Sequence, residues 1–426
     1  MSHITDHPLR YALTNELHAR PFPTLEVPCI AAYLAIKPIS NASKRDRTAD
    51  MAHLVDLLKR HGTPCPPDDA THFSGQIGQH WLKWESHTEF VTYTTFSNNV
   101  GTRPFDPNEF EVFPKDWLGQ APSARITSAL IRIIPSVSDE QLIKDVTDWF
   151  VPESAAVAQV LGNAATIAGD FRIDQAGHLR FLVCVNPDVG DKHVGRIVQS
   201  LCEIETYKAM SMLGFSRVRT MSARMGHIDD QLGHLMKEMT SGNDTAEDTL
   251  DELLEVSAEL ETMAVDSSFR FGATEAYAKI VDQRISSLRE ERLAGRQTFA
   301  EFMTRRFEPA MRTVEATQKR LGMMADRAMR ASDLLRTRVD VTRSAQNQAL
   351  LENMDKRADL QLRLQKTVEG LSTVAISYYA VSLLGYLLFP LSVPLGISKA
   401  LLTAAITLPV ILAVWWMVRR LRKKIL

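Results

Sequence analysis

The sequence is poor in cysteine, with four in 426 residues, at positions 29, 65, 184 and 202. No two of them stand at the short spacing of a zinc ribbon or a redox dithiol. A cytosolic body would also keep its thiols reduced. We therefore expect neither a thiol metal site nor a disulfide, and predict that the cysteines are buried as small hydrophobic side chains.

Catalytic motifs are also missing. The chain has no glycine-rich phosphate loop, no nucleophile elbow and no paired histidine motif of the zinc enzymes. We expect no cofactor, and no motif supports an enzyme. Residues 1–10 contain histidine, aspartate and proline where a signal peptide needs a basic start and an apolar stretch, so we expect no cleaved leader.

Positive charge is concentrated at the C-terminus. The net charge is −2, although the tail contributes five cations, at Arg419, Arg420, Arg422, Lys423 and Lys424. Subtracting this +5 from −2 leaves −7 for the residues before the tail, which argues against a general nucleic-acid binder. Residues 227–261 are mainly acidic and residues 264–366 mainly basic. These segments either pair as helices or present two solvated faces.

Charge is absent from two long apolar runs, residues 370–398 and 400–418. A hydrocarbon core about 30 Å thick needs roughly 20 apolar residues as helix, so each run is long enough to span it. Basic loops tend to stay in the cytoplasm, and two spans place both termini on one side. We predict a transmembrane hairpin over 370–418 in the lipid bilayer, a basic tail over 419–426, and cytoplasmic N- and C-termini.

The first half of the chain predicts an α+β cytosolic domain over residues 1–190. A strand, a helix and two strands occur twice, which suggests a duplicated β-α-β-β unit sharing one sheet. The expected strands are residues 29–36, 77–85, 87–96, 126–134, 164–173 and 178–185, and the expected helices are residues 43–61 and 138–150.

The next region, residues 191–369, predicts a helical and coiled-coil stalk. We expect one helix over residues 273–308, and a continuous helix over 310–370 would be roughly 90 Å long. A helix of that length cannot bury its apolar stripe alone, so we expect partner helices or a homo-oligomer. A heptad repeat typical of a coiled-coil seam runs through Val314, Leu321, Ala328 and Leu335.

The densest polar cluster lies near the N-terminus, at Asn15, Glu16, His18 and Arg20. Glu16 and His18 could act as an acid/base pair, with Arg20 holding an anion and Asn15 a polar ligand group. Alternatively, this segment is an arm held to the body by hydrogen bonds of its arginine and asparagine side chains. The sequence favours the arm, because the segment has little helical pattern and many prolines.

A second polar cluster comprises Glu85, His87 and Glu89. On one bent strand these side chains would project to the same side and could bind a ligand or a divalent cation. If the chain turns near Ser86, they separate and no metal site forms. The turn is favoured, because a single strand of about twenty residues would be exceptional.

The first apolar run carries a stripe of hydroxyl side chains, at Ser372, Tyr379, Ser382 and Tyr386. Hydroxyl groups in a bilayer commonly mark the face that packs on a neighbouring helix. Alternatively, the stripe lines a conduction path. Neither run holds an ionisable acid or base, so we expect no proton relay within the membrane.

Several longer motifs resemble a bacterial family of predicted membrane-anchored proteins of unknown function. The motifs are HPLR at 7–10, NELHARPFP at 15–23, KWE at 83–85, HTEF at 87–90, LQLRLQ at 360–365, TVEGLS at 367–372 and SYY at 377–379. The resemblance covers nearly the whole chain. It implies a bacterial inner-membrane location and a cytosolic body, and it implies no catalytic residue.

The layout is similar, more loosely, to the CorA-type magnesium channels, which are pentamers. The similarity lies in an α/β domain, a long helix entering the first of two C-terminal spans, and a basic end. The Gly-Met-Asn signature of that family is absent, and residues 390–396 read PLSVPLG instead. The first expectation is an oligomer that passes or senses a small ion. The alternatives are a tethered scaffold or ligand sensor, and a tethered enzyme using Glu16 and His18.

Overall fold

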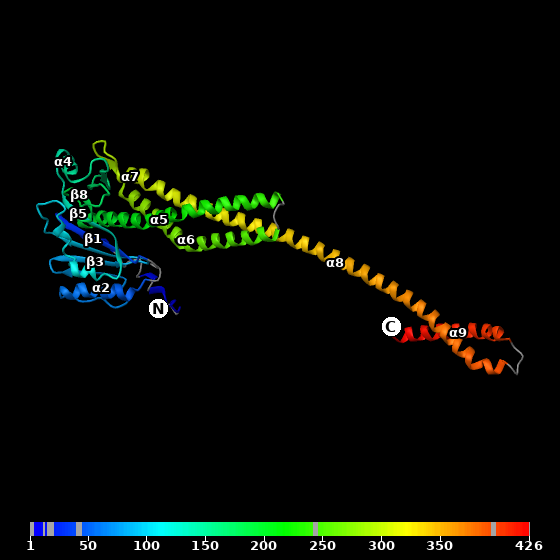
Figure 1. Cartoon of the computed structure of the whole chain (residues 1–426). Helices are drawn as coiled ribbons and strands as arrows, with labels where there is room; N and C mark the ends of the chain where they lie inside the picture. The colour runs from blue at the N-terminus through cyan, green and yellow to red at the C-terminus, as the bar shows by residue number, and fades with distance from the viewer. Residues whose placement is uncertain are drawn as a thin grey trace. The chain divides into compact units, whose positions relative to one another are not determined.

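The computed structural model describes residues 4–11, 13–14, 21–39, 45–241, 246–392 and 398–425 (Figure 1). The chain forms two compact units. The first comprises Met1–Ser241 and Asp251–Ala331, and the second comprises Gly242–Leu250 and Ser332–Leu426. The first unit therefore includes the predicted α+β domain and most of the segment predicted as stalk.

The first unit is built on one mixed sheet, which within the described residues has the order β2-β3-β4-β1-β5-β8-β7-β6-β9. The central strand β1 is buried over all its residues because both faces of the sheet are covered. The strands are β1 (Cys29–Lys37), β2 (His72–Ile77), β3 (His80–Ser86), β4 (Val91–Ser97), β5 (Ala124–Pro135), β6 (Ala156–Val160), β7 (Ala165–Gly169), β8 (Leu179–Val185) and β9 (Glu291–Arg292).

The sheet confirms the predicted α+β class and joins the two predicted halves through β1 and β5. The halves share an order of elements but differ in direction. Strand β1 is antiparallel to β4, whereas β5 is parallel to β8. A duplicated unit would keep these directions, so the likeness of the halves is limited to the order of their elements.

Two hydrophobic layers sandwich the sheet, and alternate residues of β1 feed them. Ala31, Tyr33 and Ala35 point into one layer, while Ala32, Leu34 and Ile36 point into the other. The second layer is covered by short elements: α2 (Arg47–Arg60), η2 (Pro107–Phe110), α3 (Lys115–Gly119) and α4 (Asp139–Trp149). Ser138 caps α4 by accepting a hydrogen bond from the Gln141 amide, as the predicted helix start requires.

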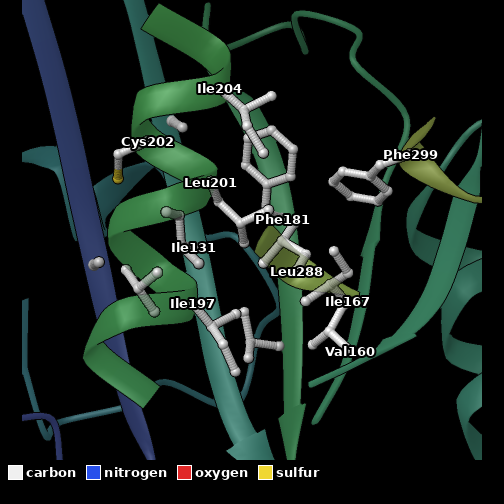
Figure 2. Packing of buried hydrophobic residues seen from close by; sticks show 14 of the residues in the cluster. Ile131, Val160, Ile167, Phe181, Ile197, Leu201, Cys202, Ile204, Leu288 and Phe299 are labelled. Atoms are coloured by element: carbon white, nitrogen blue, oxygen red, sulfur yellow. The ribbon is translucent and has the colours of Figure 1, made fainter. Parts of the chain in front are cut away.

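The first layer is covered by the helix α5 (Asp191–Ser241). Figure 2 shows Ile197 and Leu201 of α5 lying over Ile131 of β5 and Phe181 of β8. Burying each such side chain contributes roughly 1.5–3 kcal/mol. Leu288 and Phe299, which come from much later in the chain, complete the same layer. Leu288 lies beside Ile167, and the Phe299 ring lies near that of Phe181, with centroids 6.1 Å apart (Figure 2).

The cysteines follow the expectation with one exception. Cys29, Cys184 and Cys202 are buried and free, whereas Cys65 is exposed. Cys65 lies between Pro64 and Pro66 in an irregular segment after α2, where proline prevents a regular strand or helix from covering it.

Three helices of the first unit lie side by side: α5, α6 (Ala246–Leu288) and the first part of α8 (Glu308–Ser392). A Cβ atom on Gly214 would lie 2.2 Å from Thr274 Oγ1, so a glycine allows α5 and α6 to approach closely. Asp229 of α5 accepts a hydrogen bond of 2.8 Å from Arg320 of α8, and a second from Arg327. The acidic and basic segments thus pair within the chain, and the heptad residues of α8 are buried.

The predicted helix over 273–308 is wrong. Helix α6 ends at Leu288, β9 pairs with β6, and a separate helix α7 (Phe299–Arg306) follows. Arg289, Ala294 and Gly295 adopt positive φ angles, which no α-helix tolerates. The Thr298 and Glu301 side chains then form a capping box that begins α7.

The second unit contains the C-terminal part of α8 and the helix α9 (Lys399–Ile425). Both helices are long and apolar enough to cross a membrane by length and composition. Few residues in their most apolar stretches are buried within the chain. Helix α8 itself begins in the first unit, at Glu308. Pro309 lies in its first turn, where a missing N–H costs no hydrogen bond.

Candidate functional site

The N-terminal candidates Asn15, Glu16, His18 and Arg20 lie outside the described residues. The segment that follows them, residues 21–26, is described and lies against the start of α5. The Leu25 amide donates to the Asp191 carbonyl at 3.2 Å. The end of the polar motif is therefore fixed to the body of the first unit.

The second set of candidates is divided by a turn. Strand β3 ends at Ser86 and β4 begins at Val91, so the chain reverses between them. Glu85 lies 3.2 Å from Lys83 on the same face of β3, whereas Glu89 pairs with Arg270 of α6. Among the residues with described positions, no three His, Cys, Asp or Glu side chains come together as a metal site. The cation site that a single strand would have made is not formed.

The turn instead borders a narrow cleft between the sheet and α5, whose free volume of about 30 Å³ has room for one or two water molecules. Alternation along β3 and β4 aims the polar side chains of both strands at this cleft. Its lining includes Lys83, Glu85, His87, Phe90 and Thr94 from the sheet and the turn, Gln199, Glu203 and Tyr207 from α5, and Pro23 from the N-terminal segment.

A line of polar groups crosses the cleft from the sheet to the helices. Lys83 Nζ donates to Gln199 Oε1 at 2.8 Å, and Gln199 Nε2 donates to Glu203 Oε1 at 2.8 Å. Glu203 then pairs with Arg284 of α6. Burying a polar group without a hydrogen-bond partner costs free energy. This line of hydrogen bonds therefore holds α5 and α6 in one position against the sheet.

Aromatic rings form the other wall of the cleft. The His87 and Phe90 rings stack with centroids 4.4 Å apart, and Phe90 meets Tyr207 edge-on at 5.9 Å. Tyr207 in turn stacks on Tyr277 of α6 at 5.3 Å. Behind them, burial raises the pKa of the Tyr33 hydroxyl well above its usual range. The cleft therefore joins a charged edge to an aromatic edge, as is common in small-molecule sites.

The turn that carries His87 is held by a buried ion pair. Glu89 is only 1% exposed, and it accepts hydrogen bonds from the Arg270 guanidinium and, at 2.9 Å, from the Tyr277 hydroxyl. Burial and the Glu89 carboxylate raise the pKa of Tyr277. Burial and the nearby Arg270 lower the pKa of Lys37. Helix α6 thus positions one wall of the cleft.

Gly195 of α5 allows the N-terminal segment to pack closely on the helix and to close the cleft. A Cβ atom on Gly195 would lie 1.7 Å from the Pro23 carbonyl oxygen, so Gly195→Ala should lower the free energy of unfolding by about 1–3 kcal/mol. Gly226→Ala on the same helix meets no atom within 4 Å and should raise it by about 0.5–1 kcal/mol. Urea unfolding followed by circular dichroism measures both. Equal effects of the two variants would contradict the close contact.

The hydroxyl stripe of the first apolar run lies on the surface of the single chain. Tyr379 is 67% exposed and Tyr386 is 77% exposed, and Ser372 is also exposed. The Ser382 hydroxyl donates to the Tyr378 carbonyl of its own helix at 2.9 Å. The stripe is therefore not covered by α9.

Comparison with known proteins gives a family but no activity. The profile of the family described as "Protein of unknown function (DUF3422)" matches residues 5–425, nearly the whole chain. The chain belongs to the DUF3422 family. No curated protein and no solved structure gives a significant match. The resemblance to an uncharacterised family is thus confirmed, and the function of this DUF3422 protein has to be argued from its own geometry.

Several residues of the cleft were not among the sequence candidates. Gln199, Glu203 and Tyr207 stand four residues apart on α5, so they form one half-buried polar line along the helix. That spacing is a signal the sequence contains. Arg270 and Tyr277 carry no comparable signal, because their partner Glu89 is about 180 residues away.

Proposed function

We propose that this DUF3422 protein is a membrane-anchored sensor whose first unit binds a small polar molecule in the cleft between the sheet and α5. The observation that carries the proposal is the line Lys83, Gln199 and Glu203 facing an aromatic wall across the cleft. Concave sites that combine a few fixed polar groups with aromatic surface are typical of small-ligand binding. Because the cleft has a free volume of only about 30 Å³, the ligand enters when the turn between β3 and β4 moves away from α5. The two apolar helices support the anchor.

The same contacts suggest how binding is transmitted. The cleft is bordered by α5, and its turn is fixed by α6 through Glu89 and Arg270. A ligand that favours one position of the turn would also favour one position of α6, because the buried ion pair joins them. Ligand binding in the cleft would then change the position of the long helices.

Ligand binding is tested by native mass spectrometry of the full chain released from detergent micelles. We expect a small molecule to remain bound to the wild-type protein and to be lost from Lys83→Met, which removes the cationic end of the polar line. The matched control is Lys279→Met, which removes an exposed lysine that pairs with Glu275 of its own helix. Wild-type protein that carries no small molecule, and whose melting temperature no metabolite panel raises, would contradict the proposal.

The anchor is tested by fractionation. A chain that ends at Glu369 should move from the membrane pellet to the supernatant after an alkaline wash, whereas the full chain should stay in the pellet. Reporter fusions at each end test the predicted cytoplasmic location of both termini in a bacterial inner membrane. Recovery of the shortened chain in the pellet would remove the hairpin as the anchor.

A second candidate function, an oligomer that passes a small ion, is favoured by the exposed hydroxyl stripe. A tyrosine hydroxyl facing lipid has no hydrogen-bond partner, so copies of α8 that pack through Tyr379 and Ser382 would satisfy it. Light scattering of the protein in lipid nanodiscs should then give a defined ring, and liposomes containing it should pass cations. A monomer in nanodiscs would exclude this function while leaving the sensor proposal intact.

A further inference from the structure

Strand β2 forms one edge of the sheet, so its outer side has no neighbouring strand among the described residues. The Ser86 amide donates to the Thr71 carbonyl at 2.8 Å, and the register continues from this pair into the strand. In an antiparallel ladder every second residue exchanges hydrogen bonds with its neighbour, so Phe73, Gly75 and Ile77 bond to β3. The N–H and C=O groups of the alternate residues therefore point outward, at His72, Ser74 and Gln76.

This outer edge is open over most of its length. The Gln76 carbonyl accepts a hydrogen bond of 2.7 Å from the Thr63 hydroxyl, which agrees with its outward direction. No backbone hydrogen bond joins the outward groups of His72 and Ser74 to another segment that the structure describes. Both side chains are exposed. Free N–H and C=O groups in such a row can pair with an added strand.

Natural sheets protect a free edge by charge, by proline or by shortness, and the two edges of this sheet differ in this respect. Strand β9, at the opposite edge, has only Glu291 and Arg292, which are charged and exposed. Strand β2 has six residues, HFSGQI, with no proline, acid, lysine or arginine among them. The β2 edge therefore lacks the features that prevent strand addition.

Free space lies beside β2 in two hollows. The first hollow has a free volume of about 400 Å³ and is bordered by β2, β3 and the N-terminal segment. The second hollow has about 530 Å³ and lies between β2 and the loop after α2, residues 61–64. Both volumes are within the range of known ligand pockets. The lining of the first hollow is mainly apolar, with Pro21, Phe22, Pro23, Phe73, Trp81 and Trp84.

An added antiparallel strand would direct alternate side chains to the two hollows. Its residue opposite Ser74 would share the face of Trp81, whose Nε1 donates to the Ser74 hydroxyl at 2.8 Å, beside the first hollow. Its residues opposite Phe73 and Gly75 would point to the other face, beside the second hollow. Trp81 is 49% exposed and Phe22 is 50% exposed. The first hollow therefore offers aromatic surface to a bulky apolar side chain.

A second copy of the chain does not fill this hollow. In an antiparallel pair of β2 strands the residues that exchange hydrogen bonds are again His72, Ser74 and Gln76, so only polar side chains would reach the first hollow. Strand β9 of a second copy is too short to cover β2. The apolar lining would stay exposed in either case, so the occupant that fits is a strand from a different protein.

We propose that the outer edge of β2 binds an extended segment of a partner protein as an added antiparallel strand. The backbone of the segment pairs with His72 and Ser74, and every second side chain is aromatic or aliphatic and packs on Trp81 and Phe22. In strand addition the main-chain hydrogen bonds give affinity and the alternate side chains give specificity. No residue of β2 lines the cleft, so the inference does not rest on the proposed sensor function.

Binding is tested by fluorescence anisotropy of the full chain in detergent, with empty micelles as the blank. The probes are fluorescein-labelled peptides KTXTXTXTK, in which all three X positions are phenylalanine, leucine, serine or glutamate. We expect the phenylalanine and leucine peptides to bind at least about tenfold more tightly than the other two, because they cover the apolar lining. Failure of both apolar peptides to bind, or equal binding of all four, would overturn the proposal.

Methylation of single peptide amides tests the strand pairing directly. In the bound peptide the amides of the X residues face β2, and those of the threonines between them face away. An N-methyl group on the central X residue should therefore weaken binding at least about tenfold, whereas one on the next threonine should leave it within about twofold. Equal losses would mean that the peptide does not add as a strand, and would overturn the proposal.

Variants of the chain locate the site. Ser74→Pro removes an outward N–H that β3 does not use, so it should weaken binding of the phenylalanine peptide at least about tenfold without changing the circular dichroism spectrum. Trp81→Ala should weaken it similarly, whereas Phe269→Ala, which removes an equally exposed ring of α6, should leave it unchanged. Binding that survives both edge variants would overturn the proposal. If Ser74→Pro fails to fold, the methylated peptides still decide.

A disulfide test addresses the second copy as the alternative occupant. In a Cys65→Ser background, Ser74→Cys would place two thiols opposite each other in a pair of β2 strands, with Cα atoms about 5.5 Å apart and within reach of a disulfide. We expect no more linked dimer after mild oxidation than for Asp68→Cys, an exposed position before the strand. A high yield of dimer from Ser74→Cys alone would assign the edge to a second copy and overturn the proposal.

Discussion

Replacing Arg270 by methionine should lower the free energy of unfolding of the first unit by about 3–5 kcal/mol. Glu89 is almost completely buried, and Arg270, itself mostly covered, is its cationic partner. Without the guanidinium, the buried Glu89 carboxylate loses its ion-pair partner, while the hydrogen bond from the Tyr277 hydroxyl remains. Urea unfolding of the full chain in detergent, followed by circular dichroism, measures the loss.

Two further variants test whether the loss of stability comes from the unpaired Glu89 carboxylate. Arg217→Met removes an exposed partner of Asp266, at 3.9 Å, and should cost less than about 1 kcal/mol. The double variant Glu89→Leu with Arg270→Met removes both charges, so it should recover most of the stability lost in the single variant. A double variant no more stable than Arg270→Met would show that the loss does not come from an unpaired carboxylate.

Truncating Trp117 to alanine should also have a large effect, lowering the free energy of unfolding by about 3–5 kcal/mol. The Trp117 ring is fully buried, stacks on His53 with centroids 3.9 Å apart, and meets Tyr93 edge-on at 5.2 Å. Its Nε1 donates to the His53 carbonyl at 2.9 Å. The variant thus leaves a cavity under α2 and removes the hydrogen bond that joins the two elements.

Trp81 provides the matched control for this truncation. Its ring is 49% exposed, and its Nε1 donates to the Ser74 hydroxyl at 2.8 Å. Trp81→Ala removes the same side chain without opening a core cavity, so it should cost less than half as much. Similar losses in hydrogen-exchange protection of β1 for both variants would contradict the central place of Trp117.

Six of the nine strands of the described sheet were predicted from the sequence, mostly from apolar runs. Strands β2 and β6 were not expected, and the predicted strand 77–85 is wrong at its start, because it covers the turn between β2 and β3. The run CIAAYLAIK forms β1 as expected, and the strands β5 and β8 follow from similar runs. Strand β9 could not be predicted, because Glu291 and Arg292 are charged and exposed. These two residues form a strand only through pairing with Ala158 and Gln159, which are far away in the sequence.

Part of the candidate site could be predicted because its residues lie close together in the sequence. Glu85 and His87 stand out in a dense polar motif, and both line the cleft. Glu89, two residues later, does not join them, because the turn aims it at α6. Local spacing identifies side chains that share a strand, but it contains no information on which helix will supply the opposite charge.

Leu288, β9 and Phe299 come late in the sequence, and their position affects how the protein folds during synthesis. These residues complete the hydrophobic layer formed by β5 to β8 and α5, yet the ribosome adds them long after that sheet has emerged. Until then, the nascent chain exposes an apolar sheet face and an open edge at β6, both of which favour aggregation. The domain can close only shortly before the first apolar run is synthesised, so the two apolar helices emerge soon after the hydrophobic layer is complete.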